Sequence, residues 1–178
     1  NSTDGEIYIA LAQLLLARDK DEEALAWLES GRSQAPKDTV CFTLGQVYES
    51  REEYDKGKEA YRQAIELAPG FGPYYFRLVR LLLRSGDINL ARHWAGNAVT
   101  QAKNYVDSYC ALAEVHLCAG EYSEVYGICR REIQVRGRSN RLFELMIRAM
   151  GQEGNVDGAI AVCREWVDSV PREGISHE

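Results

Sequence analysis

Residues 38–71 read DTVCFTLGQVYESREEYDKGKEAYRQAIELAPGF, and this stretch decides the fold. Cys41, Leu44, Gly45 and Tyr48 are spaced i, i+3, i+4, i+7, which places them on one face of an α-helix. Leu44 has counterparts in four other stretches, at intervals of 33 or 34 residues: Leu11, Leu78, Leu112 and Met146. A repeat of this length predicts stacked helix pairs rather than a single globular core.

A second helix follows the first in each unit. In residues 38–71 its inward face is formed by Gly57, Tyr61, Ala64 and Ile65. Glycines stand at the turn between the two helices in the last three units, where a left-handed residue closes a helix: Gly86, Gly120 and Gly154. We therefore expect an all-α domain over 5–171, with short tails at 1–4 and 172–178. Its five units are 5–37, 38–71, 72–105, 106–139 and 140–171, and Pro171 is expected to end the last helix.

The pattern resembles the tetratricopeptide repeat family. The residues that carry the resemblance are Cys41, Leu44, Gly45, Tyr48, Gly57, Tyr61 and Pro69. The resemblance implies a right-handed α-solenoid in which the first helix of each unit lines a concave groove. It also implies a non-catalytic scaffold that binds another protein or a peptide.

By this resemblance, the groove is lined by Ile9, Gln13, Phe42, Gln46, Phe76, Arg77, Arg80, Arg84 and Arg148. Ile9, Phe42 and Phe76 occupy one position of successive units and are expected to form an apolar stripe, since no core role for them is evident. Arginines at i, i+3 and i+7 suit carboxylates, which a guanidinium binds bidentately. We therefore expect a partner with acidic and apolar residues. One alternative stays open: Arg77 and Arg84 are solvated, or pair with neighbours such as Glu49 and Glu114.

Charge leaves a second function class open. The chain carries 21 Lys and Arg against 27 Asp and Glu, a net charge of −6, which disfavours general nucleic-acid binding. A basic run nevertheless lies at the end of the fourth unit, at Arg130, Arg131, Arg136, Arg138 and Arg141. The alternatives to a scaffold are therefore a nucleic-acid-binding helical repeat, or a regulatory or sensor module of a larger protein such as a transcription regulator. For the latter, residues 141–148 resemble the helical activation domains of some bacterial regulators.

The sequence carries no familiar catalytic or metal-binding signature. It lacks the phosphate-loop, nucleophile-elbow and zinc-protease motifs, so we expect neither an enzyme nor a cofactor. The five cysteines form no C-x-x-C pair, so no metal site is expected. Buried free thiols indicate a reducing compartment, and we expect a cytoplasmic protein without a membrane span.

The two ends of the sequence suggest a larger context. The chain begins at Asn1, and we expect it to be a fragment of a longer protein. Few residues follow Pro171, too few for a polar capping helix. The apolar side of the last helix is therefore expected to be partly exposed and to meet another copy or further repeats; its residues are Ile160, Cys163, Val167 and Val170.

Overall fold

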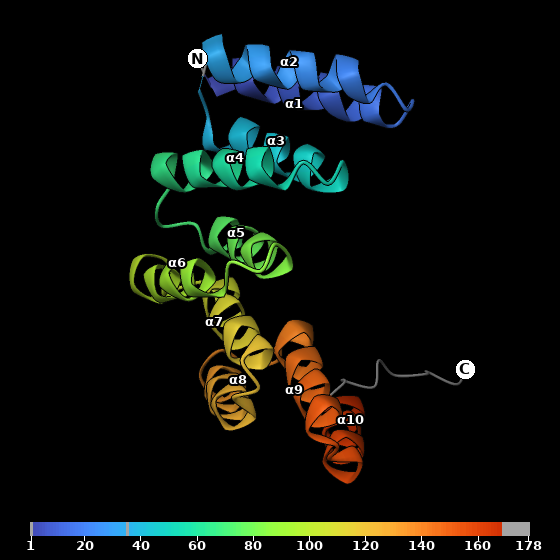
Figure 1. Ribbon diagram of the computed structural model, residues 1–178, viewed down its shortest axis with the longest axis vertical. Helices are drawn as coiled ribbons and strands as arrows, with labels where there is room; N and C mark the ends of the chain where they lie inside the picture. The colour runs from blue at the N-terminus through green and yellow to red at the C-terminus, as the bar shows by residue number, and fades with distance from the viewer. Residues whose placement is uncertain (1, 35, 169–178) are drawn as a thin grey trace, which may run out of the picture. The chain divides into compact units, whose positions relative to one another are not determined.

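A computed structural model describes residues 2–34 and 36–168, and within these ranges the chain forms ten α-helices and no strand (Figure 1). The helices are α1 (Ser2–Leu16), α2 (Asp21–Gln34), α3 (Asp38–Ser50), α4 (Tyr54–Leu67), α5 (Gly72–Arg84), α6 (Ile88–Gln101), α7 (Val106–Cys118), α8 (Tyr122–Arg136), α9 (Asn140–Glu153) and α10 (Val156–Asp168). The predicted all-α fold of tandem helix pairs is confirmed.

The chain divides into two compact units, residues 1–112 and 113–178, and each is described by itself. Treating 5–171 as one domain therefore stays a prediction. The expected helix end at Pro171 and the expected tail at 172–178 lie outside the described residues.

The turns within the helix pairs share one backbone conformation. Gly86, Gly120 and Gly154 have φ angles of 83°, 74° and 81°, so the predicted left-handed glycines are confirmed. Asp19 and Glu52 stand at the same place in the first two repeats, and their φ angles are 58° and 60°. A side chain in this region clashes with its own backbone, so these two turns are strained where the other three are relaxed.

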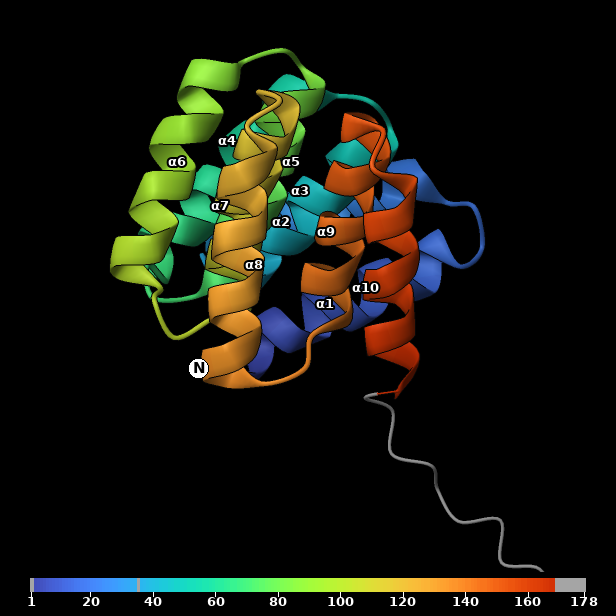
Figure 2. The same ribbon diagram turned by 90° about the horizontal axis from the view of Figure 1, so that it is seen from below.

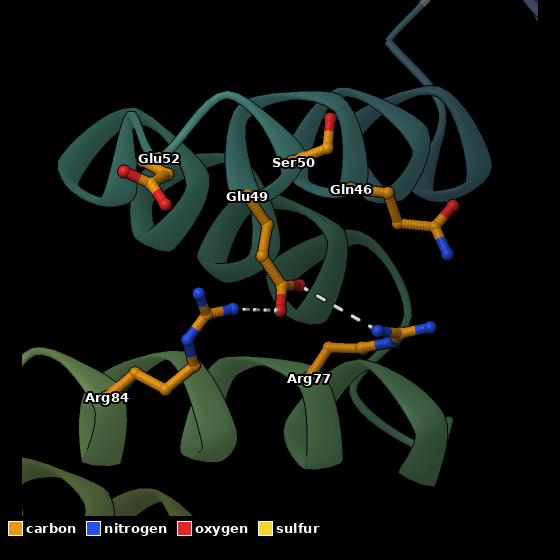
Figure 3. A pocket seen from close by; sticks show the side chains of 6 residues that line it. All are labelled: Gln46, Glu49, Ser50, Glu52, Arg77 and Arg84. Atoms are coloured by element: carbon orange, nitrogen blue, oxygen red, sulfur yellow. Dashed lines mark hydrogen bonds and ion pairs between the residues drawn. The ribbon is translucent and has the colours of Figure 1, made fainter.

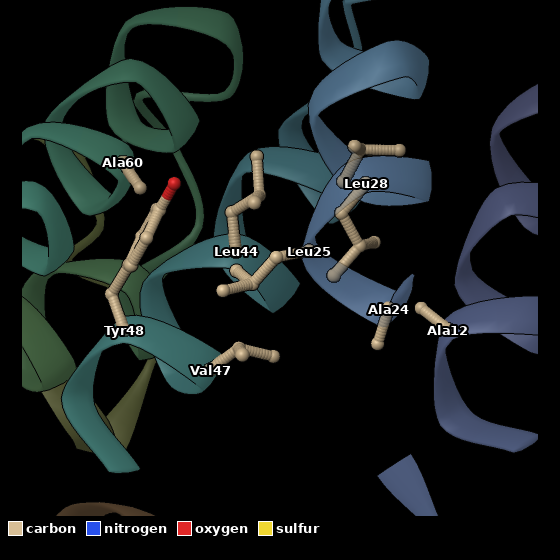
Figure 4. Packing of buried hydrophobic residues seen from close by; sticks show 9 residues of the cluster. Ala12, Ala24, Leu25, Leu28, Leu44, Val47, Tyr48 and Ala60 are labelled. Atoms are coloured by element: carbon tan, nitrogen blue, oxygen red, sulfur yellow. The ribbon is translucent and has the colours of Figure 1, made fainter. Parts of the chain in front are cut away.

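The core of the first unit is built between successive helices. Leu25 and Leu28 of α2 point toward Leu44 of α3, and all three are buried (Figure 4). Small residues let paired helices approach: Ala12 and Ala24 are fully buried where α1 meets α2. Burial of such side chains contributes roughly 25 cal/mol per Å² of apolar surface, and this is what holds the repeats together.

Gly45 shows how tight this packing is. A Cβ atom added at Gly45 would overlap the ring of Tyr61, a fully buried residue of α4. The ring therefore lies flat on the backbone of α3, and only glycine leaves room for it. The close pairing of α3 with α4 follows directly from this glycine in the quoted stretch.

In the second unit, α9 packs against both α8 and α10. The rings of Phe143 and Trp166 lie 4.5 Å apart, and the guanidinium of Arg138 lies 3.7 Å from the centre of the Trp166 ring. This cation–π contact links the loop between α8 and α9 to α10, which packs beside α9 (Figure 2).

All five cysteines are free thiols, as expected, but not all are buried. Cys41, Cys110 and Cys129 are buried, whereas Cys118 and Cys163 are exposed. The expectation of buried thiols was therefore wrong for Cys118, whereas the exposure of Cys163 agrees with the partly exposed side predicted for the last helix. Cys129 and Cys163 occupy equivalent positions, but α9 covers α8 whereas no described helix follows α10.

Candidate functional site

A surface hollow of about 420 Å³ lies between α3 and α5 (Figure 3). Three of the predicted groove residues, Gln46, Arg77 and Arg84, line it. The remaining lining residues are Glu49, Ser50 and Glu52. Gln46 therefore lies close to Arg77 and Arg84, as helix periodicity predicted, although they are more than 30 residues apart in sequence.

Glu49 is the hub of this hollow. Its carboxylate lies 3.2 Å from Arg84 Nη1 and 3.8 Å from Arg77 Nη1, and both contacts are seen in Figure 3. Tyr61 donates its hydroxyl proton to the same carboxylate at 2.8 Å. The side chain of Glu49 is only 15% exposed, whereas those of Arg77 and Arg84 are 39% and 47% exposed. The open alternative, in which these two arginines pair with Glu49, is what the structure shows.

Two tyrosines tie the hub to the surrounding fold. Burial, followed by the hydrogen bond to Glu49, raises the pKa of Tyr61, so its hydroxyl stays a donor. Arg84 also donates to the hydroxyl of Tyr54 at 2.9 Å, and its guanidinium lies 5.0 Å from the centre of that ring. One face of Arg84 is therefore held in place while the other faces the hollow.

The predicted apolar stripe is largely packed into the fold. Phe76 is 6% exposed, and Arg80 lies 5.6 Å from the centre of its ring. Phe42 is half-buried, with ring centres 4.8 Å from Tyr74 and 5.6 Å from Tyr61. The reasoning that these aromatics lack a core role was therefore wrong, because tyrosines of two other helices stack on Phe42.

The first repeat contributes a separate hollow. Ile9 is half-buried against the core and lines a space of about 470 Å³ together with Glu6, Pro36, Lys37, Asp38, Thr39 and Leu67. Gln13 is exposed on α1. Neither residue lines the hollow that Arg77 and Arg84 border.

Arg148 belongs to the second unit. It forms a bidentate pair with Glu114, at 2.8 and 3.2 Å. These hydrogen bonds raise the pKa of the Arg148 guanidinium. Its charge is therefore matched by a carboxylate within its own unit.

The basic run is also partly paired. Glu132, a buried carboxylate, accepts from Arg131 at 3.4 Å and from Arg136 at 2.7 Å. Arg138 stacks on Trp166. At least three arginines of the run thus take part in packing the end of α8 and its neighbours.

Sequence reasoning missed Glu52, which lines the hollow, and Tyr54, which accepts a hydrogen bond from Arg84. Both lie at or near the turn between α3 and α4, where helix periodicity does not reach. The signal that could have found Glu52 is its register, because the equivalent residue in later repeats is a turn glycine.

The described part of the chain offers neither a cluster of metal ligands nor a membrane-spanning helix. No group of three or more His, Cys, Asp or Glu side chains there could hold a metal ion. Among the described helices, none combines the length and the apolar character that crossing a membrane requires.

Comparison with known proteins finds the repeat again. The family model for the tetratricopeptide repeat matches residues 38–71. The Sol locus transcriptional repressor of Clostridium acetobutylicum is 30% identical over 94 residues, which cover 53% of this chain and 30% of that protein. A tetratricopeptide repeat and J domain-containing co-chaperone of Fusarium oxysporum is 25% identical over 174 residues, covering 93% of this chain and 33% of that protein. The chain thus spans about a third of the length of these curated relatives.

Solved structures agree on the fold. A tetratricopeptide repeat protein of Parabacteroides merdae superposes with a TM-score of 0.76 at 18% identity, covering 92% of this chain and 64% of that one. YrrB, described as a tetratricopeptide repeat protein with an unusual peptide-binding site, superposes with a TM-score of 0.61 at 20% identity, covering 93% and 86%. At such identities the likeness extends to the fold alone.

Proposed function

We propose that the chain is a non-catalytic scaffold whose hollow between α3 and α5 binds an acidic segment of a partner protein, as its match to the tetratricopeptide repeat and its fold suggest. The observation that carries the proposal is the pair Arg77 and Arg84, which share the single carboxylate of Glu49. Two guanidinium groups can together donate more hydrogen bonds than one carboxylate accepts. A partner's carboxylate therefore has donors to bind.

The arginines of α5 favour an acidic rather than a basic segment. The lining itself is charge-balanced, with two arginines and two glutamates, but Arg80 is exposed on the same helix as Arg77 and Arg84 and adds a positive charge beside it. Partner binding at such a site uses charge-assisted hydrogen bonds, which are stronger than neutral ones. Apolar anchoring contributes less than the sequence suggested, since Phe76 is buried.

The groove proposed from the sequence extends further, to Ile9, Gln13, Phe42 and Arg148. We keep Ile9 and Gln13 as a second contact region for a longer segment, next to the hollow that Ile9 lines. Phe42 is kept as a partly exposed apolar contact for the same segment. Arg148 is kept as a separate contact, engaged only by a partner that displaces Glu114.

The experiment is selection of short peptides from a random display library on the purified chain. Selected peptides should be rich in Asp and Glu, and their affinity is measured by fluorescence anisotropy. Replacing both Arg77 and Arg84 by Ala should weaken binding at least about tenfold. The matched control is Arg62→Ala, because Arg62 is an exposed arginine on α4 paired with Glu59. Unchanged affinity of the double variant, with its helix content intact, would contradict the proposal.

The relative from Clostridium acetobutylicum supports a second candidate, a repeat module within a larger regulator that acts on nucleic acid. Phosphate-led binding weakens by about a thousandfold or more between 50 and 200 mM salt when many phosphates are neutralised. Anisotropy with mixed-sequence DNA and RNA measures this directly. Nucleic-acid binding that Arg130→Glu and Arg131→Glu abolish, together with no acidic peptide selected, would favour this candidate.

A cytoplasmic location is part of the proposal, supported by the free thiols of Cys41, Cys110 and Cys129. Fractionation of cells that produce the tagged protein measures it.

A further inference from the structure

An apolar surface lies on the outer side of the first repeat, away from the arginine hollow. Ile7, Leu14 and Trp27 are 62%, 53% and 46% exposed. Ile7 and Trp27, with Tyr8 and Leu11, line a hollow of about 220 Å³. We call Ile7, Leu11, Leu14 and Trp27 the N-face. Large side chains exposed together in this way mark an interaction surface.

The repeat itself shows what covers this surface elsewhere. In the second repeat, Val40 and Val47 stand where Ile7 and Leu14 stand in the first, and they are 0% and 4% exposed. The helix that packs on them is α2, the second helix of the preceding repeat. In the third repeat, Tyr74 and Leu81 take these places and are buried where α4 packs on α5. The N-face is therefore shaped for the second helix of a repeat.

The chain carries one such helix with its matching face exposed. On α10, Ile160 is 44% and Val167 is 66% exposed, and Cys163 is also exposed. The counterparts of Cys163 in the first two repeats, Leu28 and Tyr61, are 0% exposed, and in both repeats the first helix of the following repeat packs on the helix that carries them. We call Ile160, Cys163 and Val167 the C-face. Val170, which the sequence adds to it, lies outside the described residues.

We propose that the N-face of one copy binds the C-face of another, so that α10 packs on α1 and α2 as α2 packs on α3. The two surfaces are different, so the contact is head to tail and leaves one face open at each end of a dimer. Only a few side chains take part, which indicates weak association that grows with protein concentration. The proposal does not depend on the arginine hollow.

Sedimentation equilibrium of the 178-residue chain over a wide concentration range tests this association. The average mass should rise with concentration for the unchanged chain. Leu14→Glu on the N-face and Ile160→Glu on the C-face should each weaken association at least about tenfold, since each places a carboxylate in an apolar contact. The matched controls are Ala10→Glu and Ala161→Glu, exposed positions of the same helices. Circular dichroism establishes that helix content is retained.

Mixing the two variants separates this contact from a symmetric one. The Leu14→Glu chain keeps an intact C-face, and the Ile160→Glu chain keeps an intact N-face. An equal mixture should form a one-to-one dimer that cannot grow further, because both of its remaining faces carry a substitution. Each variant alone should stay monomeric. A chain that is monomeric at every concentration overturns the proposal. It is equally overturned if Leu14→Glu associates like the unchanged chain, or if the mixture stays monomeric.

Discussion

Replacing Glu49 by Gln removes the negative charge at the hub of the hollow while keeping its shape. Two partly exposed ion pairs are lost, and each contributes about 0.2–1 kcal/mol; the 3.8 Å contact to Arg77 lies at the weak end. The hydrogen bond from Tyr61 persists but loses its charged acceptor, which costs about 1 kcal/mol more. We therefore expect the free energy of unfolding to fall by about 1–2 kcal/mol, against a small effect for Glu59→Gln on the surface of α4.

The same substitution should act in the opposite direction on binding. With Glu49 neutral, Arg77 and Arg84 no longer have an internal carboxylate, so an acidic peptide should bind up to about tenfold more tightly. Urea unfolding followed by circular dichroism gives the first quantity, and fluorescence anisotropy with a selected acidic peptide gives the second. Weaker binding of that peptide would refute the view that Glu49 competes for the arginines. A stability loss no larger than that of Glu59→Gln would refute its role as a hub.

Three further substitutions or reagents test the fold directly. Glu52→Gly should raise the free energy of unfolding by about 1 kcal/mol in thermal unfolding, because φ at this residue is 60°; a loss would contradict the strain argument. Gly45→Ala should lower it by about 1–3 kcal/mol, since the added methyl group overlaps the ring of Tyr61; an unchanged melting temperature would contradict the close approach. Burial raises the pKa of Cys129 to about 12, so near pH 8 a thiol reagent should modify exposed Cys163 faster than Cys129. Equal modification rates of the two cysteines by mass spectrometry would count against the burial of Cys129.

The helices and their pairing could be predicted from the sequence because their signal is local. The spacing of Leu44, Gly45 and Tyr48 predicts both the helix and the face that it buries. The turns were only half predictable. A glycine in the sequence indicates a left-handed turn residue. Asp19 and Glu52 adopt the same left-handed conformation because the geometry of the repeat requires it at that position.

The hollow could be predicted only as a set of helix positions. Periodicity placed Arg77 and Arg84 on one face of α5, but their pairing with Glu49 depends on the distance between α3 and α5. The packing of Phe42 could not be predicted for a similar reason, since its neighbours Tyr61 and Tyr74 come from two other helices. Each of these contacts joins residues whose separation in space the sequence does not encode locally.

Equivalent positions in a repeat protein serve as controls for one another. Leu28, Cys129 and Cys163 share one position, yet only the last is exposed, and the difference lies in the helix that follows rather than in the residue. The same comparison applies to Ile7 and Val40 at the other end. An exposed apolar residue at such a position therefore supports the proposed contact with a helix of the type that covers its counterparts. Arg77 and Arg84 stay partly exposed although α4 and α6 both pack on the helix that carries them, so their exposure has a different origin. Stacking of repeats gives no occupant for the hollow between α3 and α5, and this supports its proposed role as a site for a different partner.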